Sequence, residues 1–203
     1  MTATHPIQSL RRFVPAVATR ARERCEMCSL PLGAAHRHLF DSSSRNLICA
    51  CDACVLLFPG SGEAKYRAVP RRVRRLVDFT ITDAQWNGLA IPIGLAFFFR
   101  QPDAERIVAI YPSPAGTTES ELPLESWNEL ADVNPTLRSL EPDVETLLVN
   151  RTRQARDYYI APIDRCYELA GTVRKHWRGL SGGSAVWEAI DQFFARMNAE
   201  AHA

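Results

Sequence analysis

Two pairs of cysteines in the first third of the chain limit its fold more than any other feature. Cys25 and Cys28 form one C-x2-C pair, Cys51 and Cys54 form a second, and 22 residues separate the two pairs. A C-x2-C turn places two thiolates on the same side of a tight bend, and two such turns supply the four ligands of a closed tetrahedral site. The spacing therefore predicts a metal site at Cys25, Cys28, Cys51 and Cys54.

The residues between the pairs predict a β-hairpin. Residues 37–40 and 46–50 are extended in character and flank the polar turn cluster 41–45. Residues 55–58 start a short helix in this interpretation, before Pro59 and Gly60 end it. We expect residues 22–62 to form a four-cysteine zinc-knuckle module with a β-hairpin like that of a zinc ribbon.

Cys49 competes for a place among the ligands because it precedes Cys51 by two residues, on the same side of a strand. Only Cys51 and Cys54 repeat the x2 spacing, so we interpret Cys49 as a buried strand thiol, with a fifth, redox-active sulfur as the alternative. Disulfides are a further alternative, although five clustered cysteines leave one unpaired. With four thiolates available, His36 and His38 are expected to be surface or partner-contact residues.

The identity of the metal is a separate question. Four thiolates suit zinc and also a single iron ion of the rubredoxin kind. In rubredoxins a glycine usually follows the second cysteine of each knuckle, whereas Ser29 and Val55 stand at these positions here, which favours zinc. A closed zinc site activates no water and serves to fold a small domain. An iron electron-transfer protein is the alternative.

The cysteine segment is also similar to the ββα-metal fold of HNH nucleases. In this chain Asp41 follows the histidines instead of preceding them, and residues 55–58 offer no polar group. We therefore expect no enzymatic activity and no catalytic residue. A degenerate HNH-like nuclease is kept as an alternative.

Charge is distributed unevenly along a chain whose net charge is only +1. Residues 1–78 hold 13 lysines and arginines against 6 acidic residues, while residues 79–203 hold 11 against 17. The basic excess peaks at residues 65–75, so we interpret 63–78 as a basic linker. A nucleic-acid-binding zinc module is an alternative that this segment supports, although the net charge does not favour nucleic acid as the partner.

Residues 79–203 are expected to form an α+β domain, preceded by the module and by an N-terminal arm at 1–21. The apolar runs 89–99 and 106–111 predict a buried hairpin, and residues 147–149 are predicted to form a third strand. Helices are predicted at 126–133, from Pro162 onward with Cys166 in the core, and from Ser184 as N-cap. Residues 111–120 are interpreted as a surface loop and 179–183 as a helix-to-helix turn.

Two compartment signals are missing from the sequence. The longest apolar run, 89–99, is far shorter than the ~20 residues of a membrane-spanning helix. The first 24 residues contain no continuous apolar region of the kind found in secretory signals. We therefore expect a cytoplasmic protein that does not insert into a membrane.

Five segments in order, 24–32, 36–39, 49–54, 111–116 and 176–183, resemble an uncharacterised bacterial family of CxxC-containing proteins. Its members are typically encoded beside genes for uptake nickel-iron (NiFe) hydrogenases. The resemblance implies a hydrogenase-linked accessory or assembly role, with a hydrogenase subunit or maturation factor as the protein partner. It brings no catalytic residue with it.

Overall fold

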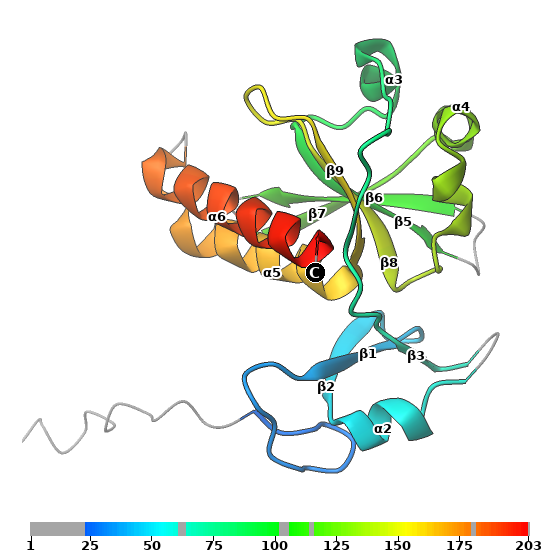
Figure 1. Cartoon of the computed structure of the whole chain (residues 1–203), viewed down its shortest axis with the longest axis vertical. Helices are drawn as coiled ribbons and strands as arrows, with labels where there is room; N and C mark the ends of the chain where they lie inside the picture. Colours follow the sequence, from blue (N-terminus) through cyan, green and yellow to red (C-terminus); the bar gives the residue numbers. More distant parts are fainter. Residues whose placement is uncertain (1–22, 61–63, 102–105, 114–115, 180–181, 203) are drawn as a thin grey trace, which may run out of the picture.

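The computed structural model describes residues 23–60, 64–101, 106–113, 116–179 and 182–202, and the predicted N-terminal arm at 1–21 lies outside them. These residues form two antiparallel sheets with associated helices, which confirms the predicted α+β class (Figure 1). The small sheet has the strand order β2-β1-β3 and the large sheet the order β4-β9-β8-β5-β6-β7. None of the helices in the described part of the chain has the length and apolar character needed to cross a membrane.

The small sheet is built on the hairpin that the sequence predicts. Its elements are β1 (Arg37–Asp41), β2 (Asn46–Ala50), α2 (Asp52–Leu57) and β3 (Tyr66–Ala68). The Asp41 carboxylate accepts hydrogen bonds from the backbone and hydroxyl of Ser43, at 2.9 and 2.6 Å, and from the backbone of Ser44 at 3.3 Å. These bonds fix the turn and set the register, in which Asp41 lies opposite Asn46.

The segment 63–78 differs from the expected basic linker because it contributes a strand to each sheet. β3 pairs with β1, and β4 (Arg74–Arg75) pairs with β9. Val69 and Val73, between these strands, are buried. The boundaries of the predicted domains stay a prediction.

The large sheet is buried on both faces. Its longer strands are β5 (Leu95–Gln101), β6 (Arg106–Ser113), β7 (Gly116–Glu121), β8 (Glu145–Asn150) and β9 (Asp157–Pro162). One face packs against α5 (Ile163–His176) and α6 (Gly183–Ala201), and the other against α3 (Asp83–Gly88), α4 (Leu124–Val133) and the 3-10 helix η1 (Pro135–Ser139) (Figure 1). Phe97 and Phe99 of β5 face the first layer, whereas Ala96 and Phe98 face the second. This explains the unbroken apolar run.

Several local predictions need correction. Residues 89–94 precede the strand, which begins at Leu95, and residues 116–120, expected within a surface loop, belong to strand β7. Helix α6 begins at Gly183 with Gly182, not Ser184, as its N-cap. Gly182 has φ +87°, and a Cβ there would come within 2.8 Å of Val186 Cγ1, so this position requires glycine. Residues 180–181 of the predicted turn lie outside the described residues.

The buried hairpin β5–β6, the strand at 147–149 and the core position of Cys166 are confirmed. A separate small cluster joins the two sheets, and it consists of Phe40, Val69, Val144 and Ile163. Phe40 lies in β1 and Ile163 begins α5, so the hairpin packs against the first turn of that helix.

Candidate metal centre

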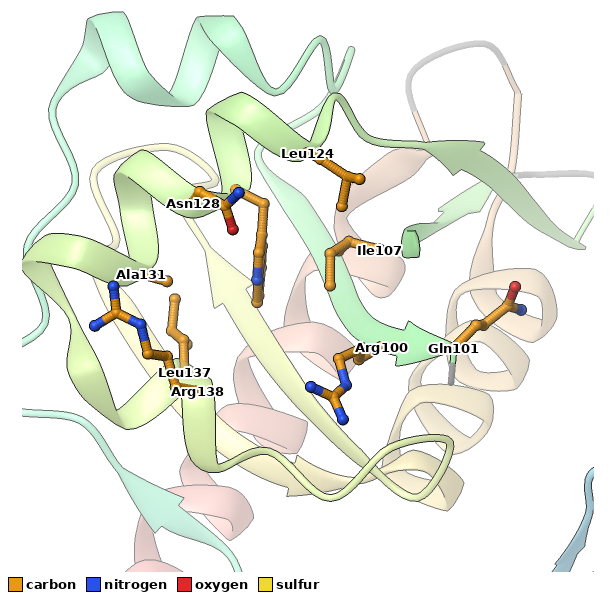
Figure 2. Close-up of a pocket in the computed structure, with 9 residues that line it drawn as sticks. Arg100, Gln101, Ile107, Leu124, Asn128, Ala131, Leu137 and Arg138 are labelled. Atoms are coloured by element: carbon orange, nitrogen blue, oxygen red, sulfur yellow. The ribbon is translucent and has the colours of Figure 1, made fainter. Parts of the chain in front are cut away.

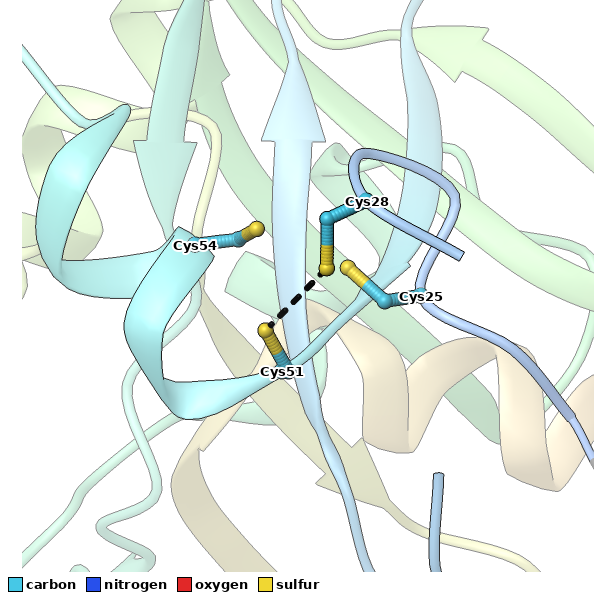
Figure 3. Close-up of side chains that lie close together, drawn as sticks. All are labelled: Cys25, Cys28, Cys51 and Cys54. Atoms are coloured by element: carbon cyan, nitrogen blue, oxygen red, sulfur yellow. Dashed lines mark hydrogen bonds between the residues drawn. The ribbon is translucent and has the colours of Figure 1, made fainter. Parts of the chain in front are cut away.

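The structure brings the four predicted cysteines together (Figure 3). Their sulfur atoms all lie within 4.8 Å of one another, and the Sγ atoms of Cys28 and Cys51 are 3.7 Å apart. Sulfurs around a tetrahedral zinc ion, at Zn–S bonds of about 2.3 Å, are separated by roughly 3.8 Å. Cys25, Cys51 and Cys54 are buried and Cys28 is exposed. The donor set and spacing fit a closed four-thiolate centre.

Backbone hydrogen bonds shape the two knuckles. In the first, the N–H of Ser29 donates to the Cys25 carbonyl at 2.7 Å, and Ser29 has φ +64°. Ser29 thus adopts the left-handed conformation that glycine adopts most readily, so the lack of glycine does not prevent this turn. In the second knuckle Cys51 is the N-cap residue of α2 and Cys54 lies in its first turn.

The argument from Ser29 to zinc therefore loses its force, because the knuckle turn forms with serine in place of glycine. What the four sulfurs support directly is a centre for a thiophilic metal ion.

The first knuckle is joined to strand β2 beside the second. The N–H of Glu26 donates to the Cys49 carbonyl at 2.9 Å, and the N–H of Cys49 donates to the Glu26 carboxylate at 2.7 Å. This reciprocal pair holds the loop carrying Cys25 and Cys28 against the strand that leads into Cys51. The candidate metal site is thus preorganised by contacts other than those of the sulfurs.

The four thiols differ in acidity. Burial acts to raise the pKa of Cys25, but hydrogen bonds from the backbones of Cys51, Cys28 and Met27 outweigh it and lower the pKa to about 6. Burial and the neighbouring sulfurs raise the pKa of Cys54. Packed thiols resist collective ionisation because their negative charges repel, and a bound divalent cation removes that obstacle.

Cys49 lies apart from the four-cysteine group and instead accompanies His36 and His38. These two histidines are not simple surface residues, since their side chains are only 9% and 23% exposed. The prediction that His36 and His38 are surface or partner-contact residues took no account of Cys49, which pairs with His38 across the hairpin. The available signal was the turn: a hairpin closed by Asp41 and Asn46 puts His38 opposite Cys49.

The basic segment is partly neutralised within the chain. Arg74 lies 4.0 Å from Glu145, and Arg75 lies 3.5 Å from Asp157. Arg71 and Arg72 are exposed. The arginines of β4 are therefore part of the sheet's own charge pairing, which weakens their case as a nucleic-acid surface.

A cavity of about 440 Å³ lies in the large domain, between α4, η1 and the adjoining ends of β5 and β6 (Figure 2). Ile107, Leu124 and Trp127 contribute apolar lining, and Arg100 and Arg138 contribute positive charge. Arg138 is ion-paired with Asp132. Its lining residues include no paired nucleophile and base.

Comparison with known proteins identifies the family but no activity. No curated protein and no solved structure matched the chain. A protein-family model matches residues 24–201, which include both cysteine pairs and both sheets. The chain therefore belongs to a family described as a family of unknown function, DUF5947.

Proposed function

We propose that this protein is a non-enzymatic accessory factor in which a zinc ion, held by Cys25, Cys28, Cys51 and Cys54, folds a module that contacts a protein partner. The observation that carries the proposal is the composition of the module's own core. Its buried members are Cys25, Leu39, Ala50, Cys51, Cys54 and Val55. Half of these residues are cysteines, so a bound ion would supply much of the cohesion that apolar contacts give to a larger core.

An exposed apolar surface supports the partner-binding part of the proposal. Leu56 and Leu57 of α2 are 78% and 76% exposed, and Phe58 directly after the helix is 44% exposed. We call these three residues the α2 patch. Contiguous apolar side chains that are exposed to solvent are typical of surfaces that bind another protein. The patch begins two residues after Cys54, on the same helix, so metal binding would fix its position.

The resemblance to proteins encoded beside NiFe-hydrogenase genes supplies the candidate partner, a hydrogenase subunit or maturation factor. A cytoplasmic location accords with that partner. The four-thiolate centre is placed here in a folding role because a closed zinc site has no open coordination position. An iron ion in the same four sulfurs would instead give a rubredoxin-like electron-transfer protein.

The metal assignment is tested by elemental analysis and absorption spectroscopy of the purified protein. We expect zinc and no visible colour in the wild type. Cys25→Ser and Cys54→Ser should lose the ion of this centre and destabilise the module, because site formation and folding are coupled. Cys166→Ser is the matched control, since Cys166 is a buried cysteine in the other domain, beside Thr146.

Two results would overturn the assignment. Visible thiolate-to-iron absorption that bleaches on reduction would replace zinc with iron and the folding role with electron transfer. Unchanged metal content in both knuckle variants would show that the four sulfurs are not the ligands.

A further inference from the structure

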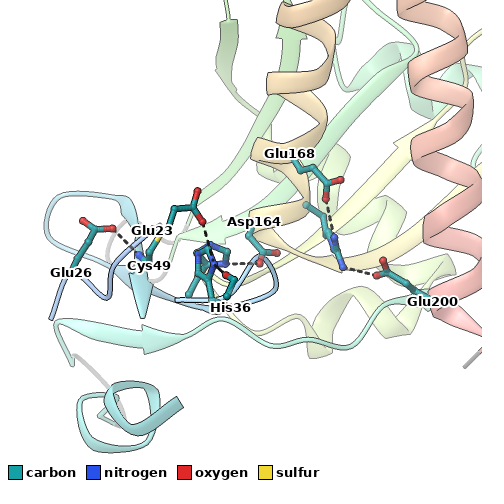
Figure 4. A network of polar contacts seen from close by, with 10 residues as sticks. Glu23, Glu26, His36, Cys49, Asp164, Glu168 and Glu200 are labelled. Atoms are coloured by element: carbon teal, nitrogen blue, oxygen red, sulfur yellow. Dashed lines mark hydrogen bonds and ion pairs between the residues drawn. The ribbon is translucent and has the colours of Figure 1, made fainter. Parts of the chain in front are cut away.

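Three potential ligands converge on the β1–β2 hairpin, apart from the four cysteines. His38 and Cys49 are directly paired across the two strands, and His36 lies two residues before His38. One ring nitrogen from each histidine and the Cys49 sulfur all lie within 4.8 Å of one another. Figure 4 shows His36 and Cys49 close together, with Asp164 nearby. The two imidazole rings meet edge to face, with centroids 4.8 Å apart.

The hydrogen bonds of the two rings fix which nitrogen is available. His38 Nδ1 lies 2.9 Å from a carboxylate oxygen of Asp164. His36 Nδ1 lies 3.1 Å from the Gly33 carbonyl oxygen and 3.4 Å from a Glu23 carboxylate oxygen. Carbonyl and carboxylate oxygens only accept, so Nδ1 carries the proton in both rings. In the neutral form of each ring, Nε2 then keeps its lone pair and is the nitrogen that can bind a cation.

The His36 ring supplies a second, independent observation. Its Nε2 atom is buried and has no hydrogen-bond partner among the described residues. A buried polar atom without a partner costs free energy unless a ligand satisfies it. A metal ion bound at Nε2 removes this cost.

The surroundings resemble those of protein metal sites. A histidine that binds metal usually donates its other N–H to a carboxylate or backbone carbonyl, which orients the ring and raises its basicity. His38 has the carboxylate of Asp164 and His36 has the carbonyl of Gly33 in this role. Glu23 and Glu26 also lie close by, so the local charge favours a cation.

We propose that His36, His38 and Cys49 bind a second zinc ion, separate from the four-thiolate centre, through one nitrogen of each ring and the thiolate. Two imidazoles and one thiolate suit zinc, and three protein ligands leave the fourth position to water or a partner's side chain. The site differs in kind from the closed centre because an exogenous ligand can reach its ion. Asp164 comes from α5, so the ion would be held at the junction of module and large domain.

The test counts zinc ions per chain by elemental analysis, after the full-length protein is saturated with Zn²⁺ and free metal is removed. We expect two ions in the wild type, and one in both Cys49→Ser and the double variant His36→Ala with His38→Ala. His202→Ala is the matched control and should keep two, because His202 is an exposed histidine at the end of α6. Circular dichroism checks that the variants remain folded.

A second variant separates ligation from structure. Asp164→Asn keeps the size of the side chain but weakens the orienting contact with His38. We expect it to lower zinc affinity at this site by about 10- to 100-fold while the four-thiolate centre stays filled. One ion in the wild type, or two in the double histidine variant, would overturn the proposal without affecting the four-thiolate assignment.

Discussion

At the scale of single residues, the acidity of the cysteine thiols governs when the four-thiolate centre can form. Metal binding needs thiolates, so it displaces every proton that the free thiols still carry. Cys25, with a pKa lowered to about 6, is mostly ionised at neutral pH, whereas the pKa of Cys54 is raised and its thiol is protonated. The centre therefore releases protons when it fills.

We expect the zinc affinity of this centre to fall as the pH is lowered, and to fall more steeply below about pH 6. Above that pH the ion need not displace a proton from Cys25, and below it the ion must. Competition with a chromophoric chelator between about pH 5 and pH 8 measures the slope. Cys166→Ser should give the same profile, and an affinity independent of pH would contradict the expectation.

The four cysteines could be predicted from sequence because a C-x2-C turn is local, and its geometry follows from its spacing. Two other residue-level features could not. The left-handed φ of Ser29 breaks the usual preference for glycine, and the meeting of His38 with Cys49 depends on the register of the hairpin. The contact between His38 and Asp164 spans 126 positions, and no local pattern reports it.

At the scale of elements, strand β5 contributes to both hydrophobic cores of the large domain because helices cover both of its faces. Phe98 is fully buried, with ring centroids 6.2 Å from Trp86 and 6.1 Å from Trp127. On the other face, Phe97 and Phe99 belong to the core under α5 and α6. One strand therefore supplies aromatic side chains to two separate cores.

We expect Phe98→Ala to lower the free energy of unfolding of the large domain by about 3–5 kcal/mol, because it leaves a cavity between two tryptophans. Arg100→Ala on the same strand is the control and should change it by under about 0.5 kcal/mol, since Arg100 is exposed. Denaturant unfolding followed by tryptophan fluorescence measures both. Equal effects of the two variants would contradict the role given to β5.

Long apolar strands could be predicted from the sequence, whereas short or polar strands could not. The apolar runs of β5 and β6 predict their hairpin correctly. Strand β7 has the sequence GTTESE, which lacks apolar alternation because it lies at the edge of the sheet. Strand β4 consists of two arginines, whose charge conceals their backbone pairing with β9. An edge strand of this kind is defined by its pairing with a neighbouring strand. The local sequence pattern carries no information on that pairing.

At the scale of the whole molecule, the module and the large domain are packed against each other. Phe40 and Val69 pack against Val144 and Ile163, and His38 contacts Asp164. The α2 patch, by contrast, contains side chains that remain exposed in this arrangement. It is available to a partner while the module stays docked.

We expect the double variant Leu56→Asp with Leu57→Asp to lose binding to a hydrogenase subunit or maturation factor without losing metal. Both side chains are exposed, so the charges should spare the fold and abolish an apolar contact. Affinity purification from the native cell after nuclease treatment, with mass spectrometry and metal analysis, measures both properties. Val77→Asp is the control, because Val77 is 79% exposed outside the patch.

Recovery of the same hydrogenase-related proteins with the double variant would exclude the α2 patch as the contact. Recovery of nucleic acid in place of protein from untreated extract would favour the zinc module as a nucleic-acid binder. Arg71 and Arg72 would then be the residues to change, because Arg74 and Arg75 are paired within the sheet.

The five residues 69–73, between β3 and β4, have a consequence for how this chain can vary. Both ends of the segment are held by strand pairing, one in each sheet, and both Val69 and Val73 are buried. An inserted or deleted residue would reverse the facing of one strand or pull it from its partner. The segment 69–73 therefore has a fixed length. We expect related proteins to carry insertions elsewhere in the chain and to contain both the module and the large domain.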